Sequence, residues 1–213
     1  MLKKLKAAGI RVEQGDTLIE VLFAVAVYSA IAVGAIVIMN QGVSAAQASL
    51  EINLVRNQID TQAELLRHLH DGALTSIGRN DSPASAQWAA AVAVSDAPAP
   101  SYSTHITTFD ECTPDKLPAG AFFIDPTSGM VIRGQGNFQT PVTFAQVRLS
   151  ETVGVASKAD MIWVQAVRNN NPTGATLDNT SFYDFHIRAC WDSPGAKTMM
   201  KLGTIVRLYV PEN

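Results

Sequence analysis

The sequence predicts an α+β fold in which a long N-terminal helix packs on an antiparallel β-sheet. Three observations lead to this prediction. An unbroken apolar run extends from Leu18 to Met39. From residue 40 to residue 72, apolar side chains recur with the spacing of an amphipathic helix. From Tyr102 onward the period falls to two, which is typical of strands that bury one face.

The apolar run is long enough to cross a membrane as a helix. About 22 residues at a rise of about 1.5 Å give about 33 Å, which matches a bilayer core. We therefore predict a membrane-spanning helix over residues 16–39. A secretory signal peptide is an alternative, although its apolar core is normally only about 7 to 15 residues long. Four basic residues precede the run and would hold the N-terminus in the cytoplasm: Lys3, Lys4, Lys6 and Arg11.

Glu20 is the unusual residue of this run, because a carboxylate at that depth is costly and is rarely kept without a partner. A positively charged amine from a neighbouring subunit would neutralise it and fix the axial offset between adjacent helices. The alternative is a plain single-pass anchor whose glutamate reaches back to the membrane interface.

Residues 40–72 are predicted to continue the same helix and to end near Gly72. The apolar positions with helical spacing are Val43, Ala46, Leu50, Leu54, Val55, Ile59, Leu66 and Leu69. Charged residues fall between them and are expected to face solvent: Glu51, Arg56, Asp60, Glu64 and Arg67. We do not predict a metal site at His68, His70 and Asp71, because helix positions two apart do not share a face. We expect a solvated helix end there.

The rest of the chain, residues 73–213, is predicted to form one globular, β-rich domain with a sheet of four to six strands. Residues 73–102 are interrupted by three prolines and are expected to form a surface loop, with Trp88 docking on the core in a helical turn or a strand. A hairpin is expected at Pro126–Gly129. The candidate strands cover residues 105–109, 121–125, 130–133, 142–149, 161–168, 182–191 and 204–210.

The two cysteines, Cys112 and Cys190, lie outside the predicted membrane segment. An even number of cysteines outside the cytoplasm favours a disulfide, which would close a loop of about 80 residues and contribute about 4 kcal/mol in the chain-entropy model. Two free buried thiols are the alternative.

The composition argues against nucleic-acid binding, and the sequence contains no recognisable catalytic or metal-binding motif. The chain of 213 residues has a net charge of -3; without residues 1–15 it holds 12 basic and 18 acidic residues, a net charge of -6. An acidic domain is a poor non-specific ligand for nucleic acid. No catalytic motif, cofactor motif or metal-ligand spacing is present. The polar loop 169–179 offers oxygen ligands, but without the spacing of a calcium loop. We predict no enzyme activity, no metal and no cofactor.

The N-terminal residues resemble those of a known family. A basic leader, Gly15, the sequence Asp16-Thr17-Leu18-Ile19-Glu20 and an apolar helix are similar to the class III signal of type IV pilins and of the pseudopilins of type II secretion. The resemblance implies that a prepilin peptidase removes residues 1–15 by cutting after Gly15 and methylates the new amine of Asp16. It also implies that Glu20 mediates subunit assembly.

Two departures from the family pattern suggest a minor subunit. The residue after the cut is Asp16 where the family usually has phenylalanine, and the helix lacks the proline that many major pilins carry. The implied partners are other pilin subunits, the prepilin peptidase, the membrane, and an assembly ATPase with its platform. The implied location is the cytoplasmic membrane, with the N-terminus inside, and then a pilus or a periplasmic pseudopilus. A membrane-anchored binding protein that does not polymerise is the main alternative, and a secreted hydrolase is a third.

Overall fold

The computed structural model describes residues 16–76, 82–93, 112–150, 157–169, 181–196 and 198–210. The chain divides into two compact units, Met1–Ala46 and Gln47–Asn213. Each unit is described by itself. The predicted strand at residues 105–109 lies outside the described residues, and so does the predicted polar loop 169–179 except for Asn169, which ends β6.

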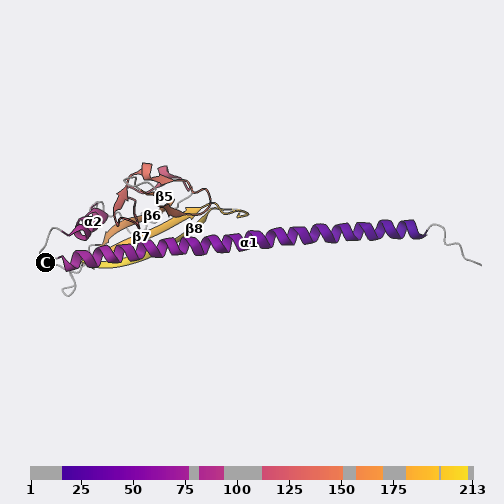
Figure 1. The fold of residues 1–213 in the computed structure, drawn as a ribbon, viewed down its shortest axis with the longest axis horizontal. Coiled ribbons are helices and arrows are strands. Elements are labelled where there is room, and N and C mark those ends of the chain that lie inside the picture. Colours follow the sequence, from indigo (N-terminus) through magenta and orange to yellow (C-terminus); the bar gives the residue numbers. More distant parts are fainter. Residues whose placement is uncertain are drawn as a thin grey trace, which may run out of the picture. The chain divides into compact units, whose positions relative to one another are not determined.

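Helix α1 extends from Asp16 to Thr75, three residues beyond the predicted end at Gly72. Its first part belongs to the first unit, and its second part packs on the sheet of the second unit (Figure 1). The expected α+β arrangement of a long apolar N-terminal helix and an antiparallel sheet is therefore present.

Only part of the predicted apolar pattern of α1 packs on the sheet. The buried apolar residues are Val55, Ile59, Ala63, Leu66 and Leu69. Leu50 and Leu54 were also expected to pack, but their exposed fractions are 60% and 37%. The reason is the position of these residues around the helix axis, because successive residues are rotated by about 100°. One stripe along the helix contains Val43, Ala46, Leu50 and Leu54. The buried apolar residues are centred roughly 150° around the helix from that stripe.

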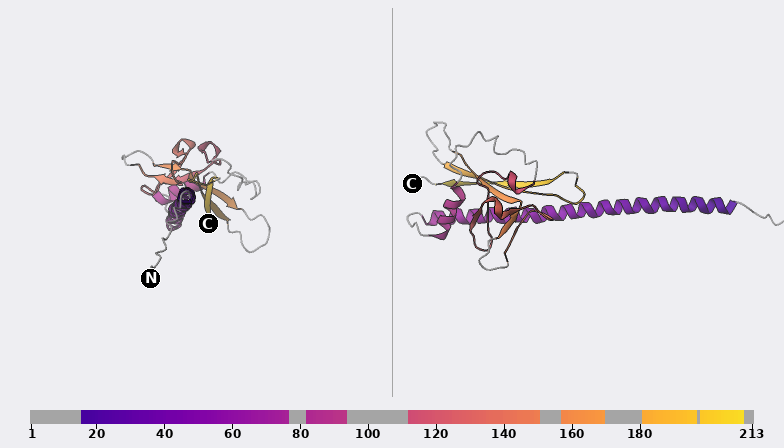
Figure 2. Two further views of the ribbon diagram at one scale, coloured as in Figure 1. Left: turned by 90° about the vertical axis from the view of Figure 1, so that its right-hand side faces the viewer. Right: turned by 90° about the horizontal axis from the view of Figure 1, so that it is seen from above.

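The main sheet has five antiparallel strands in the order β2-β1-β6-β7-β8. The strands are β1 (Phe122–Ile124), β2 (Val131–Arg133), β6 (Ile162–Asn169), β7 (Ser181–Trp191) and β8 (Met200–Val210). Four of them match predicted strands, and β8 begins four residues earlier than predicted. Figure 2 shows from two further directions how these strands gather on one side of the second part of α1.

The predicted hairpin between β1 and β2 is confirmed. The Asp125 amide donates to the Met130 carbonyl oxygen over 2.9 Å, and the Asp125 carboxylate accepts from the Thr127 amide and the Ser128 hydroxyl. Gly129 completes the turn with a φ of 68°, a conformation that other residues adopt at a cost.

A second, three-stranded sheet was not predicted. It consists of β3 (Phe138–Gln139), β4 (Gln146–Arg148) and β5 (Lys158–Asp160), in the order β3-β5-β4. The β3–β5 pairing is parallel, so the antiparallel expectation holds for the main sheet alone. Strand β4 covers only three residues of the predicted strand 142–149. Two short 3-10 helices, η1 (Pro114–Lys116) and η2 (Gln135–Asn137), complete the described elements.

The segment predicted to be a surface loop contains a ten-residue helix, α2 (Pro83–Val92). Ser82 caps it and Pro83 occupies its first turn, where proline is favoured. Trp88 docks on the core as expected, with ring centroids 6.1 Å from Tyr183 and 5.5 Å from Phe185.

Helix α2 also covers the β2 edge of the sheet. The Gln87 side-chain oxygen accepts from the Val131 amide over 2.8 Å. The Arg133 guanidinium of β2 donates to the carbonyl oxygens of Ala90 and Ala91 at the end of α2. The Val131 amide at this edge thus has a partner within the fold, and the Arg133 side chain holds α2 in place.

A buried glutamine joins α1 to strand β1. Gln62 is 1% exposed, and its amide nitrogen donates to the Ile124 carbonyl oxygen over 2.7 Å. Its side-chain oxygen accepts from the Ile124 amide over 2.8 Å. Gln62 therefore occupies the place that a neighbouring strand would take beside Ile124.

Candidate functional site

The described part of the first unit is an apolar helix whose large side chains are exposed on every side. Among the described residues of α1 up to Ala46, large apolar side chains such as Leu18, Phe23 and Tyr28 are exposed, with fractions from 42% to 74%. A helix that is apolar all round is typical of a membrane span or of a packed core made with other chains. This part of α1 is long and apolar enough to be a single membrane span.

Glu20 is the one charged residue between Leu18 and Leu50. Its side chain is exposed, and no ion pair that the structure describes involves it. The same stretch contains no lysine, arginine or histidine, so no cation on this part of the helix can neutralise the carboxylate. Any partner must come from the chain terminus or from another molecule.

The proposed processing site lies at the limit of the described residues. Gly15 is outside them, and Asp16 is the first residue of α1. Cleavage after Gly15 and methylation of Asp16 therefore stay predictions from the sequence. Farther along the helix, the Ser29 hydroxyl donates to the Val25 carbonyl oxygen over 2.7 Å, which satisfies a polar group in an apolar surrounding.

The predicted disulfide is present. Cys112 and Cys190 are bonded, with a Cα–Cα distance of 5.8 Å and a separation of 78 residues. It ties the segment before η1 to β7, the strand between β6 and β8. Such a bond is typical of proteins that fold outside a reducing compartment.

The face of the sheet that points away from α1 is less exposed than predicted. Asp184, His186 and Cys190 of β7 alternate with the apolar residues that face the helix, yet they are only 1%, 3% and 1% exposed. Strand β7 lies between β6 and β8 in the sheet, so side chains of both neighbouring strands pack beside these residues on the same face. The Arg207 guanidinium of β8 binds the Asp184 carboxylate through two hydrogen bonds of 2.8 and 2.9 Å, and this pairing raises the pKa of Arg207.

The same face contains a cavity of about 340 Å³. Its lining includes Trp163 of β6, His186 and Arg188 of β7, and Lys201, Gly203 and Ile205 of β8. The strand register accounts for the cavity. Arg188 of β7 lies between Trp163 of β6 and Gly203 of β8, and Gly203 has no side chain to fill the space. A Cβ on Gly203 would lie 3.3 Å from Arg188 Cγ, so the stem of Arg188 passes over the glycine.

Two basic residues line this cavity. Arg188 and Lys201 carry its positive charge, and none of its lining residues that the structure describes is acidic. Burial, and next the charge of Arg188, lower the pKa of His186, while Asp184 acts in the opposite direction. Burial also lowers the pKa of Arg188. His186 itself is buried beside this cavity.

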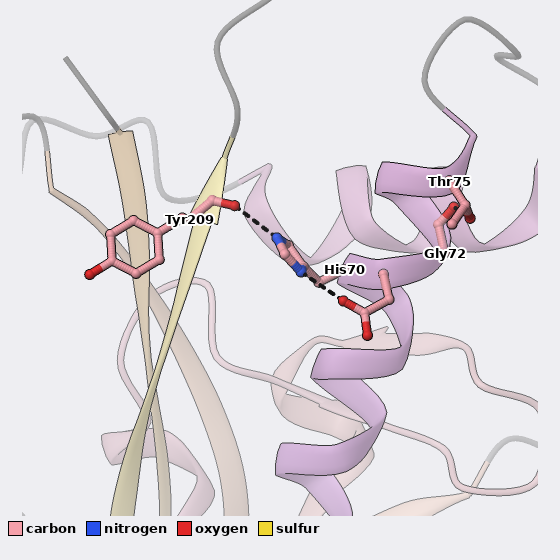
Figure 3. Close-up of polar contacts among 5 residues, drawn as sticks. His70, Gly72, Thr75 and Tyr209 are labelled. Atoms are coloured by element: carbon pink, nitrogen blue, oxygen red, sulfur yellow. Dashed lines mark hydrogen bonds and ion pairs between the residues drawn. The ribbon is translucent and has the colours of Figure 1, made fainter. Parts of the chain in front are cut away.

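His70 is not the solvated residue that the sequence suggested. Its Nε2 lies 2.8 Å from the Tyr209 carbonyl oxygen and its Nδ1 lies 3.2 Å from an Asp71 carboxylate oxygen (Figure 3). A carbonyl oxygen only accepts, so Nε2 carries a proton and donates. The ring also contacts Trp88, with centroids 5.1 Å apart. His70 thus joins the end of α1 to the end of β8.

The residues that connect α1 to the sheet through polar contacts were missed by the sequence analysis. Besides Gln62, the Gln58 side-chain oxygen accepts from the Val147 amide over 3.2 Å. Glu51, expected to face solvent, accepts from the Trp191 indole nitrogen over 2.9 Å. The amphipathic pattern gave no signal for these contacts, because each partner lies far away in the sequence.

No group of three or more metal-binding side chains occurs within the described residues. No family model matches the chain, and comparisons with curated proteins and with solved structures find no match.

Proposed function

We propose that this chain is a minor type IV pilin or a type II secretion pseudopilin, a structural subunit that is processed after Gly15 and then assembled into a filament. The observation that carries the proposal is Glu20, a lone carboxylate in a helix that is otherwise apolar and exposed on every side. Its position four residues after Asp16 is the feature that resembles the pilin signal.

The energetics of Glu20 favour an intermolecular partner. A carboxylate in the hydrocarbon region costs about 3 kcal/mol, and neutralisation by a nearby cation removes much of that cost. Because residues 18–50 supply no cation, the amine created by cleavage before Asp16 is the natural partner. An amine on a neighbouring subunit would set the stagger between two helices, as single polar contacts do in helical bundles.

The outward-facing stripe of α1 supports the same proposal. Leu50 and Leu54 are exposed and lie on a different side of the helix from the residues that contact the sheet. Exposed leucines in a soluble segment are ordinary one at a time, but a stripe with helical spacing is typical of helices that pack against other helices. The disulfide agrees with an extracytoplasmic domain.

The mature N-terminus tests the processing step. The mass of the protein purified from its native membrane should correspond to a chain that starts at Asp16, with or without one added methyl group. A chain that starts at Met1 would leave α1 as a plain anchor. A chain that starts beyond Ala30 would indicate a secreted protein, and both results would contradict the proposal.

Substitution of Glu20 tests the assembly step. Glu20→Ala should abolish incorporation into sheared filaments while the subunit still accumulates in the membrane. Tyr28→Phe is the matched control, because it removes another polar group from the same helix and should leave incorporation unchanged. Normal incorporation of Glu20→Ala would favour an anchored binding protein that does not polymerise.

A further inference from the structure

His70 lies where three elements of the domain meet: the end of α1, the end of β8 and helix α2. Its side chain is only 12% exposed. Its Nε2 faces the Tyr209 carbonyl oxygen and its Nδ1 faces an Asp71 carboxylate oxygen (Figure 3). The ring also lies against Trp88 of α2. Both ring nitrogens therefore have an oxygen atom as their neighbour.

One protonation state of His70 satisfies both contacts. A backbone carbonyl and an ionised carboxylate accept hydrogen bonds and donate none. A neutral imidazole has one N–H group, so the bond to Tyr209 would leave the Nδ1 lone pair facing the negative oxygen of Asp71. The imidazolium ion has two N–H groups and donates to both oxygens. The observed geometry therefore fits protonated His70.

The charges on α1 around His70 make Asp71 the partner of the added proton. Arg67, one turn earlier, is paired with Glu64 over 2.5 Å. His68 is exposed, and helix positions two apart do not share a face. Asp71 is therefore the charged residue of this helix that contacts His70.

In the other described elements near this histidine, the cations are engaged elsewhere. Helix α2 contains no charged residue. On β8, Arg207 binds Asp184 on the opposite face of the sheet. Arg168 of β6 lies over the Tyr183 ring, which in turn contacts Trp88, so two aromatic rings connect Arg168 to the histidine.

We propose that His70 is a pH-sensitive latch between α1 and the end of β8. When the pH falls through the range in which histidines titrate, Nδ1 takes up a proton from solvent and donates a second hydrogen bond, to Asp71. When the pH rises, that proton leaves, the Nδ1 lone pair faces the Asp71 carboxylate, and the bond from Nε2 to Tyr209 remains.

The latch acts on a strand that has a single neighbour. Within the described sheet, β8 pairs with β7 alone, so its other side receives no support from a further strand. Acidic conditions therefore hold the end of β8 more firmly on the helix than alkaline conditions do. The latch is separate from Glu20 and does not depend on filament assembly.

Nitrogen-15 NMR of the histidine rings tests the protonation states on the full chain in a neutral detergent. At about pH 5.5, below the ordinary histidine value, both nitrogens of His70 should give the chemical shift of protonated nitrogen. At about pH 8.5, Nδ1 should lose its proton while Nε2 keeps one, because the Tyr209 carbonyl selects that tautomer. The exposed His68 serves as the internal reference.

Urea unfolding measures how firmly the second bond holds. His70→Gln keeps a donor near the position of Nε2 and has no group that can become charged. The urea midpoint of the native protein should exceed that of His70→Gln by about 0.3–1 M more at the acidic pH than at the alkaline pH. Taking this difference at each pH removes the effect of His186, whose lowered pKa changes stability in the opposite direction. His68→Gln is the matched control and should show no such change.

Asp71→Asn locates the partner of the proton. Asp71 is 77% exposed, so the fold should tolerate this variant, and circular dichroism checks it. In the Asp71→Asn background, the difference in urea midpoint that His70→Gln causes should change little with pH, because the amide carries no charge.

Three results would overturn the proposal. Loss of the Nε2 proton at about pH 8.5 would mean that the Tyr209 carbonyl does not hold the ring. An equal midpoint difference at both pH values would mean that the second bond holds nothing. A pH-dependent difference that survives Asp71→Asn would assign the effect to the carbonyl groups at the end of α1.

Discussion

The contact between Gln62 and strand β1 allows a direct test of what holds α1 on the sheet. Replacing Gln62 by methionine keeps the length and volume of the side chain but removes both of its hydrogen bonds. The Ile124 amide and carbonyl, now bonded over 2.8 and 2.7 Å, would be left buried without a partner. Each such group costs about 1–3 kcal/mol, and the gain from burying an apolar methionine offsets part of this. We expect a loss of about 2–4 kcal/mol in the free energy of unfolding.

The loss can be measured by urea unfolding of the full chain in a neutral detergent, followed by tryptophan fluorescence. Trp163 and Trp191 are buried in the domain and report its unfolding. Asn57→Met is the matched control, since it introduces the same side chain at an exposed position of the same helix and should change stability by less than about 0.5 kcal/mol. A loss below about 1 kcal/mol for Gln62→Met would refute the reasoning, because the two bonds would then contribute no more than ordinary exposed contacts.

Three further predictions concern the same domain. First, burial and, next, the charge of Arg188 lower the pKa of His186 in the folded protein. The unfolded chain therefore binds a proton at His186 more tightly than the folded chain does. Stability should therefore fall as the pH drops below about 6.5, and urea midpoints at neutral and mildly acidic pH should show a smaller fall for His186→Gln. Second, Gly72→Ala places a Cβ 2.6 Å from the Ala84 Cβ and should cost about 1–3 kcal/mol, with Ala84→Gly restoring much of the thermal midpoint in the double variant. Third, reduction of the disulfide should lower the free energy of unfolding by about 4 kcal/mol, and equal urea midpoints before and after reduction would contradict that.

Much of the architecture could be predicted because its signals are local. The apolar run and the helical spacing that follows it indicate one long helix, and α1 covers Asp16–Thr75. The strands with clear alternation, such as β6 and β7, appear where expected. The hairpin at Asp125–Met130 follows from proline and glycine chemistry that needs no distant partner.

Other features depend on distant residues and left no local signal. The short strands β3 and β5 depend on pairing with distant residues, β3 with β5 and β5 also with β4, and segments of two or three residues show no period. Helix α2 was missed because three prolines occur in residues 73–102, although only Pro83 lies in the helix and, with Ser82, forms a recognisable helix start. The alanines that follow favour a helix once that start is accepted.

Polar residues of α1 show most clearly why a pattern of apolar positions is insufficient. Glu51 was expected to face solvent, and Gln62 is not part of the apolar pattern, yet both bind groups of the sheet: Gln62 binds β1 and Glu51 binds Trp191. Burial of a polar side chain depends on whether a partner meets it, and here the partners are 62 and 140 residues away. The angular offset between Leu54 and Val55 could have been seen in the sequence, because it follows from helix geometry alone.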